Sequence, residues 1–226
     1  MSLQALQDQV VACRKCPRLI AWCEHVASHK RAAYRDDDYW GGPVPGFGDL
    51  AARVLIVGLA PGAHGANRTG RMFTGDRSGD WLYRSLHRAE FANQPHSIDR
   101  NDGLVLSDAF ITAGVRCAPP DNKPTTAEQN TCRAYLQQEL TLMPQLRVII
   151  ALGGLAWNSL FRALAAVDLH DSPRPKFGHG AEVSVGPYLV IGCYHPSQQN
   201  TFTGRLTEPM LDAVFLRARD IIQPRI

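Results

Sequence analysis

The sequence predicts an α/β fold, a single-domain three-layer sandwich in which a central four-stranded parallel sheet is flanked by helices on both faces. Four short apolar runs alternate along the chain with segments whose apolar residues recur at helical spacing. The chain has 226 residues, of which 45% are hydrophobic, so it can bury one core of ordinary size. No internal repeat interrupts the pattern, and we expect residues 1–226 to form one domain.

The first 40 residues precede the sheet and predict two helices. Leu3, Leu6 and Val10 recur on one face of the first helix, and Pro17 indicates a turn before the second. Residues 41–48 are too rich in glycine and proline for regular structure. We expect them to form a loop that leads into the sheet.

Strands and helices alternate in the rest of the chain. We expect strands at residues 54–59, 110–115, 148–152 and 189–193. We expect helices at residues 79–89, 127–142, 155–165 and 206–221. Right-handed crossovers would place these helices on both faces of the sheet. Because ligands bind beyond the carboxyl ends of parallel strands, the residues that follow the strands should meet at one rim: Ala60, Cys117, Gly153 and His195.

Charge and composition limit the partners. The net charge is only +3, so any contact with DNA has to be local. Arginine makes up 20 of the 24 basic residues, which fits paired phosphate contacts and fits a GC-rich genome equally well. No apolar stretch reaches the length of a bilayer span, and the N-terminus lacks a signal-type apolar core. We therefore expect a cytoplasmic protein with no membrane partner.

Six cysteines in a reducing compartment are expected to be ligands, redox groups or buried small side chains rather than disulfides. Four of them form a CxxC…C…C pattern: Cys13, Cys16, Cys117 and Cys132. This spacing fits a structural zinc site and an iron–sulfur cluster about equally, with inert thiols as a weaker alternative. Cys23 and Cys193 fall outside the pattern, and we expect them to pack in the core.

Two glycine-rich segments, at residues 58–76 and 195–207, directly follow apolar runs. Their glycines allow the backbone to approach a flat or anionic ligand. Asp76 offers a charge and His195 a proton donor. From the residues alone, structural roles stay open, because His195 could serve as a buried hydrogen-bonding group and Asp76 could cap the following helix. Asp80 is the competing cap that would free Asp76 for chemistry.

These two segments resemble the paired active-site motifs of the uracil-DNA glycosylase superfamily. The forms Ala-Pro-Gly-Ala-His-Gly at residues 60–65 and Arg-Leu-Thr at residues 205–207 are most similar to family 5, the iron–sulfur B-type enzymes. The resemblance implies a DNA repair glycosylase that flips uracil, hypoxanthine and other modified bases out of duplex DNA. Such an enzyme hydrolyses the N-glycosidic bond and leaves an abasic site.

The resemblance also implies a partner and a mechanism class. The partner is double-stranded DNA that contains deaminated bases, so a monomeric enzyme associated with the nucleoid is expected. None of the four lysines lies in the two segments, which favours water over an amine as the nucleophile. We therefore expect a monofunctional glycosylase.

Site residues follow from the same resemblance. The catalytic residues are expected to be Asp76, His195 and Asn122. The base is expected to contact Phe73, Gly58, Ala60, Gly62 and His64, with the ring of Phe73 stacking on it. The DNA backbone and the vacated stack are expected to contact Arg68, Arg71, Ser197, Arg205 and Leu206, the last as a wedge. The cofactor is expected to be a structural [4Fe-4S] cluster on Cys13, Cys16, Cys117 and Cys132.

The sequence departs from the family 4 pattern at two places that family 5 shares. Ala113 stands where family 4 has an asparagine that reads uracil, and Ala63 and His64 replace acidic residues. The second departure makes Asp76 the candidate carboxylate. The first makes Asn122 the best substitute reader of the base, although a purely structural turn is an equal alternative for it.

Two other functions remain open at this stage. The motifs could hold a ligand without chemistry in a metal- or cluster-containing nucleic-acid-binding protein. A cluster could also serve electron transfer. Formation of abasic sites in DNA separates the glycosylase from both.

Overall fold

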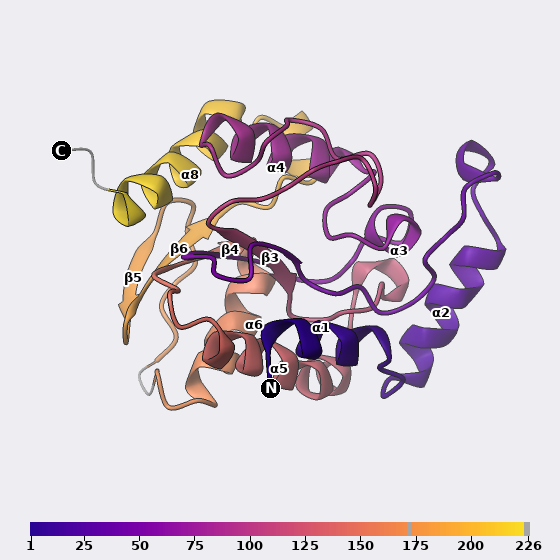
Figure 1. The fold of residues 1–226 in the computed structure, drawn as a ribbon, viewed down its shortest axis with the longest axis horizontal. Coiled ribbons are helices and arrows are strands. Elements are labelled where there is room, and N and C mark those ends of the chain that lie inside the picture. The colour runs from indigo at the N-terminus through magenta and orange to yellow at the C-terminus, as the bar shows by residue number, and fades with distance from the viewer. Residues whose placement is uncertain (171–172, 224–226) are drawn as a thin grey trace.

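A computed structural model describes residues 1–170 and 173–223 (Figure 1). Its strands are β1 (Phe47–Gly48), β2 (Val54–Gly58), β3 (Ala109–Ala113), β4 (Val148–Leu152), β5 (Glu182–Val185) and β6 (Tyr188–Cys193). Its α-helices are α1 (Leu3–Val11), α2 (Pro17–Ser28), α3 (Ala66–Thr69), α4 (Arg77–Arg88), α5 (Thr126–Leu142), α6 (Gly154–Ala165), α7 (Gln198–Phe202) and α8 (Glu208–Ile222). Two 3-10 turns, η1 (Ala32–Tyr34) and η2 (Pro120–Asn122), complete the elements of the described residues.

All the strands belong to one mixed sheet, in the order β1-β3-β2-β4-β6-β5. The central strands β3, β2, β4 and β6 run parallel to their neighbours within that group. The edge strands β1 and β5 pair antiparallel with β3 and β6. The α/β class is therefore as predicted, but the prediction of a four-stranded, wholly parallel sheet was wrong because it omitted both edges.

The missed strands have a common physical reason. A strand at the edge of a sheet is partly exposed, so it lacks the continuous apolar run that marks a buried parallel strand. β1 has only two residues and lies in the segment that was predicted to be a loop. β5 alternates exposed and less exposed positions, and joins β6 through a tight turn in which Gly186 has a φ of +52°.

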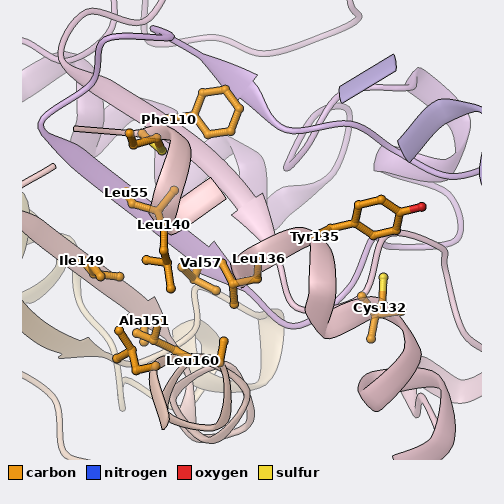
Figure 2. Packing of buried hydrophobic residues seen from close by; sticks show 14 of the residues in the cluster. Leu55, Val57, Phe110, Cys132, Tyr135, Leu136, Leu140, Ile149, Ala151 and Leu160 are labelled. Atoms are coloured by element: carbon orange, nitrogen blue, oxygen red, sulfur yellow. The ribbon is translucent and has the colours of Figure 1, made fainter. Parts of the chain in front are cut away.

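Helices cover both faces of the sheet (Figure 1). α1, α5 and α6 lie on one face, while α4 and α8 lie on the other. Figure 2 shows Leu55 and Val57 of β2 beside Leu136 and Leu140 of α5 and Leu160 of α6. Each such buried aliphatic side chain contributes about 1.5–3 kcal/mol of transfer free energy to folding. The two apolar layers hold the sheet rigidly enough to position loops at its edge.

Caps fix the ends of the long helices, which lie within a turn of their predicted bounds. Thr125 and Glu128 form a reciprocal capping box at the start of α5. Thr207 caps α8, which therefore begins slightly later than predicted. Asp76 caps α4, and Asp80 lies inside its first turn. The prediction that Asp80 would be the cap was wrong.

The N-terminal segment folds as two helices, as predicted. Pro17 is the first residue of α2, where its missing N–H costs no hydrogen bond. The short helices α3 and α7, which were not predicted, lie within the two glycine-rich segments. Among the described residues, no helix is long and apolar enough to cross a membrane.

Candidate active site

A cavity of about 820 Å³ lies at the carboxyl ends of β2, β4 and β6. Residues 59–76, here called the β2 loop, and residues 194–207, the β6 loop, supply most of its lining. Gly153 and Leu155, at the start of α6, also line it. The cavity has the size of a small-molecule site and can hold a nucleoside. Asp76 and His195, predicted to share one cavity, both line it.

The Asp76 carboxylate is held by the start of α4. Its Oδ1 accepts a hydrogen bond of 2.9 Å from the backbone N–H of Gly79. Its Oδ2 lies against Gly65, where a Cβ atom would stand only 2.0 Å away, so the β2 loop requires glycine there. Burial raises the pKa of Asp76, and the backbone N–H groups of Gly79 and Ser78 act in the opposite direction. One carboxylate oxygen is thus occupied by the cap, while the residue still lines the cavity.

The His195 imidazole follows β6 and is neutral over the physiological range. The side chain is half-buried, yet the surrounding protein atoms remove enough hydration to lower its pKa to about 4. Its backbone carbonyl accepts a 2.8 Å hydrogen bond from Asn200, which fixes the turn into α7. Among the described residues, no hydrogen bond occupies the ring nitrogens, so a ring N–H is available to a ligand.

The Phe73 ring lies between Gly58 and His195. Phe73 adopts a left-handed backbone with φ of +52°, which is uncommon for an aromatic residue and is typical of functional sites. A Cβ atom at Gly58 would stand 3.1 Å from the ring, so Gly58 lies under Phe73 rather than on the cavity surface. The Phe73 and His195 ring centroids are 5.8 Å apart. Ala60 and Gly62, also predicted to contact the base, line the cavity.

His64 lies outside the cavity lining, so its predicted contact with the base is not supported. The Tyr39 hydroxyl and the Nδ1 atom of His64 share a hydrogen bond of 2.9 Å. The Tyr34 ring stacks on His64 at a centroid distance of 6.4 Å. Burial and then the charges of Arg31 and Arg68 lower the pKa of His64. The residue is part of a small aromatic cluster beside the loop.

Arg68 and Arg71 were predicted to grip phosphate, and their positions contradict that. The side chain of Arg71 is 4% exposed and makes a two-pronged ion pair with Asp102 at 2.7 and 2.9 Å. Arg68 donates to Asp37 at 2.5 Å and to the carbonyls of His64 and Gly75. Both guanidinium groups stabilise the β2 loop from inside, and each of their nitrogen atoms already donates at least one hydrogen bond within the protein.

The β6 loop presents a different set of side chains to solvent. Ser197 and Arg205, predicted DNA contacts, line the cavity, and the Arg205 guanidinium lies 4.7 Å from the Tyr194 ring. Leu206 is 0% exposed and packs in the core, so it cannot serve as the predicted wedge. Phe202 is 66% exposed at the end of α7, with Arg77 over its ring at 4.7 Å.

Phe202 and Arg77 were missed by the sequence analysis. Phe202 lies on α7, which was not predicted, and Arg77 lies just before the predicted start of the α4 helix, so helical phase pointed to neither residue. Asn122 was predicted and lines the cavity from η2, where it is exposed and has φ of +56°. Asparagine tolerates that backbone conformation better than most residues.

The four cysteines of the sequence pattern line a second, smaller cavity: Cys13, Cys16, Cys117 and Cys132. It lies between the N-terminal helices, the segment after β3 and α5. Cys23 and Cys193 are buried, as expected for packing residues. Within the described ranges, no three histidine, cysteine or acidic residues are arranged to hold a single metal ion.

Comparison with known proteins finds relatives that are similar in sequence over most of this chain. A sequence model of the "Uracil DNA glycosylase superfamily" matches residues 45–219. The type-5 uracil-DNA glycosylase of Mycobacterium tuberculosis is 53% identical over 222 residues, which cover 97% of this chain and 82% of the relative. The type-5 uracil-DNA glycosylase of Thermus thermophilus is 49% identical over 220 residues, which cover 97% and 98%. A type-4 uracil-DNA glycosylase of Pyrobaculum aerophilum is 33% identical over 200 residues, which cover 87% and 84%.

The matched region spans the sheet and both glycine-rich loops. The chain belongs to the uracil-DNA glycosylase superfamily, whose active-site motifs its two loops resemble. Within the superfamily its relatives at 43–53% identity, from bacteria and an archaeon, are of type 5. The resemblance to family 5 that was drawn from the motifs is confirmed.

Proposed function

We propose that this chain excises uracil from DNA, and that it also accepts hypoxanthine and other deaminated bases. Its membership of the superfamily makes it a DNA repair glycosylase, a hydrolase acting on N-glycosyl bonds. The observation that carries the substrate proposal is a single cavity lined by a carboxylate, an imidazole and an aromatic ring, those of Asp76, His195 and Phe73. We propose that it works as a monomer on chromosomal DNA in the cytoplasm.

Asp76 serves the sugar side of the reaction in this proposal. Stretching the bond between C1′ and the base gathers positive charge on deoxyribose, as in sugar hydrolysis. A nearby carboxylate lowers the free energy of that charge and orients the attacking water. The cap hydrogen bond from Gly79 holds one oxygen in place and leaves the other for this task. The ionised carboxylate is the active form.

His195 serves the base side. Negative charge develops on the departing base, and a ring N–H can donate a hydrogen bond to the base oxygen. Because the pKa of His195 is about 4, the imidazole is neutral at pH 7 and acts as a hydrogen-bond donor rather than as an acid. Its fixed position after β6 means that little reorganisation accompanies the reaction.

A base that reaches this cavity has to leave the stack, and the proposal therefore includes base flipping. The Phe73 ring replaces a neighbouring base as a stacking face. Ala113 is buried at the end of β3 and offers no polar side chain to the base. Asn122 is the exposed amide on the cavity, and we propose that it reads the base edge. One adaptable amide is consistent with acceptance of several deaminated bases.

The β6 loop makes the proposed DNA contacts. Ser197 and Arg205 are placed to contact phosphates beside the cavity. Phe202 replaces Leu206 as the proposed wedge, since its ring is exposed and a flat ring can fill the gap that a flipped base leaves. Arg77 covers that ring in the free protein and is a further phosphate contact.

We also propose that the four cysteines hold a [4Fe-4S] cluster. Four thiols around one cavity are the donor set that such clusters use. Glycosidic hydrolysis moves no electrons, so the cluster supplies a cross-link. It would connect the start of α2 to α5 and to the segment after β3.

The test measures single-turnover formation of abasic sites in duplexes that contain uracil or hypoxanthine. Wild type should cleave both, and Asp76→Asn and His195→Ala should each be slower by about 10²–10³-fold. Asparagine keeps the cap, because its amide oxygen still accepts from Gly79. Asn122→Ala should change the ratio of the two substrates with a smaller loss of rate.

Iron and sulfide analysis accompanies the assay. Wild-type protein that holds its cluster and makes no abasic site in any duplex would contradict the proposed substrates and would favour a nucleic-acid-binding role. Zinc in place of iron would contradict the cofactor alone. A single-stranded version of each substrate shows whether the duplex is required.

A further inference from the structure

A buried ion pair lies beside the cysteine cavity. The Arg116 Nη2 atom is 2.6 Å from the Glu139 Oε2 atom, and the side chains are 1% and 0% exposed. Glu139 also accepts hydrogen bonds from Thr112 at 2.8 Å and from Gln7 at 3.1 Å. The carboxylate oxygens are therefore well supplied with donors. Arg116 is the only cation in this network.

The guanidinium of Arg116 is incompletely satisfied. Its Nε and Nη1 atoms are sealed from water and have no hydrogen-bond partner among the residues that the structure describes. Leaving a buried donor unpaired costs about 1–3 kcal/mol, and more for a charged group. Folded proteins rarely keep such donors unless another group satisfies them. The ion pair with Glu139 uses only the Nη2 atom of Arg116, so it does not explain the buried N–H groups at Nε and Nη1.

The unpartnered donors belong to a residue that lines the cysteine cavity. Arg116 precedes Cys117 in the chain, and its backbone N–H donates to the Cys132 sulfur at 3.3 Å. Cys132 lies on α5 beyond the leucines that pack on the sheet, near Tyr135 (Figure 2). Apart from the cysteines, the lining is mostly apolar: Leu19, Ile20, Pro43 and Val115, with Thr131 and Tyr135. Lys15, the second cation of the lining, is exposed.

We propose that Arg116 donates its free N–H groups to the sulfur atoms of the cluster and sets both its retention and its reduction potential. This inference rests on the proposed cofactor. Four thiolates make the cluster region strongly negative, and donors to sulfur stabilise electron-rich sulfur. They therefore favour the reduced state and raise the reduction potential. Glu139 partly offsets the positive charge of Arg116 and holds its guanidinium group in position.

Two single variants should shift the potential in opposite directions. Arg116→Met removes the donors and the cation, so the midpoint potential should become more negative. Glu139→Gln removes the opposing charge and keeps the arginine, so the potential should become more positive. Both variants weaken the same buried network, so a purely structural role for Arg116 would give loss of stability without opposite shifts.

The measurements are made on the full-length protein loaded with its cluster. They are iron and sulfide content, midpoint potential, and the rate at which a chelator bleaches the visible absorbance of the cluster. Arg116→Met should lose iron about 10–100-fold faster than wild type. Thr112→Val is the matched control, because it removes a donor to Glu139 without removing a donor of Arg116. Thr112→Val should lower the thermal stability of the protein and leave the midpoint potential of the cluster unchanged.

A second variant covers the case in which Arg116→Met does not fold. Arg116→Met with Glu139→Met has no buried charge, and such replacements are often neutral or stabilising. Its potential should still be more negative than that of wild type. Equal potentials in this variant and wild type would overturn the inference while leaving the cofactor proposal intact. Wild-type protein without iron and sulfide would overturn both.

Discussion

The β2 loop and the β6 loop share one cavity, but they use their side chains differently. In the β2 loop, Arg71 is buried against Asp102 and Arg68 is bonded to Asp37 and to backbone carbonyls. In the β6 loop, Arg205 lines the cavity and is exposed, and Phe202 is exposed at the end of α7. Each loop supplies one proposed catalytic group, Asp76 or His195. The first loop is stabilised by internal polar bonds, whereas the second leaves its groups free for a partner.

The difference shows why an arginine inside a recognised motif is a poor predictor of a phosphate contact. A guanidinium has five N–H donors, and its role depends on how many of them the protein already uses. The β2 loop uses the donors of Arg68 and Arg71 to build the cavity wall. In the β6 loop, the Arg205 guanidinium lies over the Tyr194 ring, and no hydrogen bond or ion pair to another described residue occupies it. Variants in the two loops should therefore fail in different ways.

The largest effect is expected at the buried pair of the β2 loop. Burial alone would raise the pKa of Asp102, but hydrogen bonds from Arg71 and from the backbone N–H groups of Leu104 and Ile98 lower it to about 2. Arg71→Met leaves this carboxylate buried without its cation, so that only backbone N–H groups still bond to it. We expect a loss of about 3–5 kcal/mol in the free energy of unfolding, measured with urea.

The same variant should retain its activity per folded molecule, and its salt dependence of DNA binding should match that of wild type. Arg71→Met combined with Asp102→Leu serves as the control and should recover part of the stability. A folded Arg71→Met protein with a weaker salt dependence would mean that this arginine does reach phosphate.

The neutral imidazole of His195 predicts a dependence of stability on pH. Its pKa is about 4 in the folded protein and near 6.5 in the unfolded chain, so the unfolded chain binds more protons between these values. The stabilising contribution is complete above pH 6.5 and is lost as the pH falls toward 4. The loss should amount to about 3 kcal/mol in the free energy of unfolding relative to His195→Gln.

Urea melts of the two proteins at pH 7 and pH 4.5 measure most of this loss, about 2.5 kcal/mol. The excision rate of wild type should also show no inflection from His195 between pH 6 and 8. If the difference in stability between the two proteins is the same at both pH values, the imidazole is not held neutral by burial.

Phe202 and Leu206 separate contact with DNA from packing within the β6 loop. Phe202→Ala should weaken duplex binding by about 1–3 kcal/mol, because a stacking face is lost, and should leave thermal stability unchanged. Leu206→Ala should do the reverse, with a loss of about 2–5 kcal/mol of stability and normal activity per folded molecule. Fluorescence anisotropy with a labelled duplex and thermal melts measure the two effects. A binding defect confined to Leu206→Ala would restore the original assignment of the wedge.

The smallest effect is expected for Arg205. Arg205→Met should weaken binding equally for all sequences and reduce the slope of log affinity against log salt by about 1. Its stability should stay within about 0.5 kcal/mol of wild type, because the side chain is exposed. Arg217→Met is the matched control, since Arg217 is an exposed arginine that pairs with Glu182 at the sheet edge. An unchanged slope for Arg205→Met would remove this residue from the interface.

The sequence predicted the parts of the fold that have a local signature. The central strands are continuous apolar runs because they are buried on both faces, and the long helices have apolar periodicity. β1 and β5 have no such signature, because pairing at an edge depends on neighbours distant in the chain. α3 and α7 are too short for a periodic pattern.

The site was predicted unevenly for a related reason. Asp76 and His195 stand in motifs whose resemblance to a family is specific, and both line the cavity. The partners of Arg71 and His64 lie 31 and 25 residues away, so their internal bonds could not be seen in the motifs. Leu206 was misassigned because an apolar residue beside a helix start fits a wedge and a core position equally well.

In the proposed reaction, a histidine that stays neutral also limits which bases are good leaving groups. A neutral imidazole can donate a hydrogen bond to the departing anion, but it does not protonate the base. The base therefore has to leave as an anion. Uracil forms a comparatively stable anion at the nitrogen that leaves the sugar, whereas cytosine forms a poorer one. In the proposed reaction, a neutral His195 therefore favours uracil over cytosine through leaving-group acidity, whereas thymine, whose anion is about as stable as that of uracil, has to be refused by the shape of the cavity.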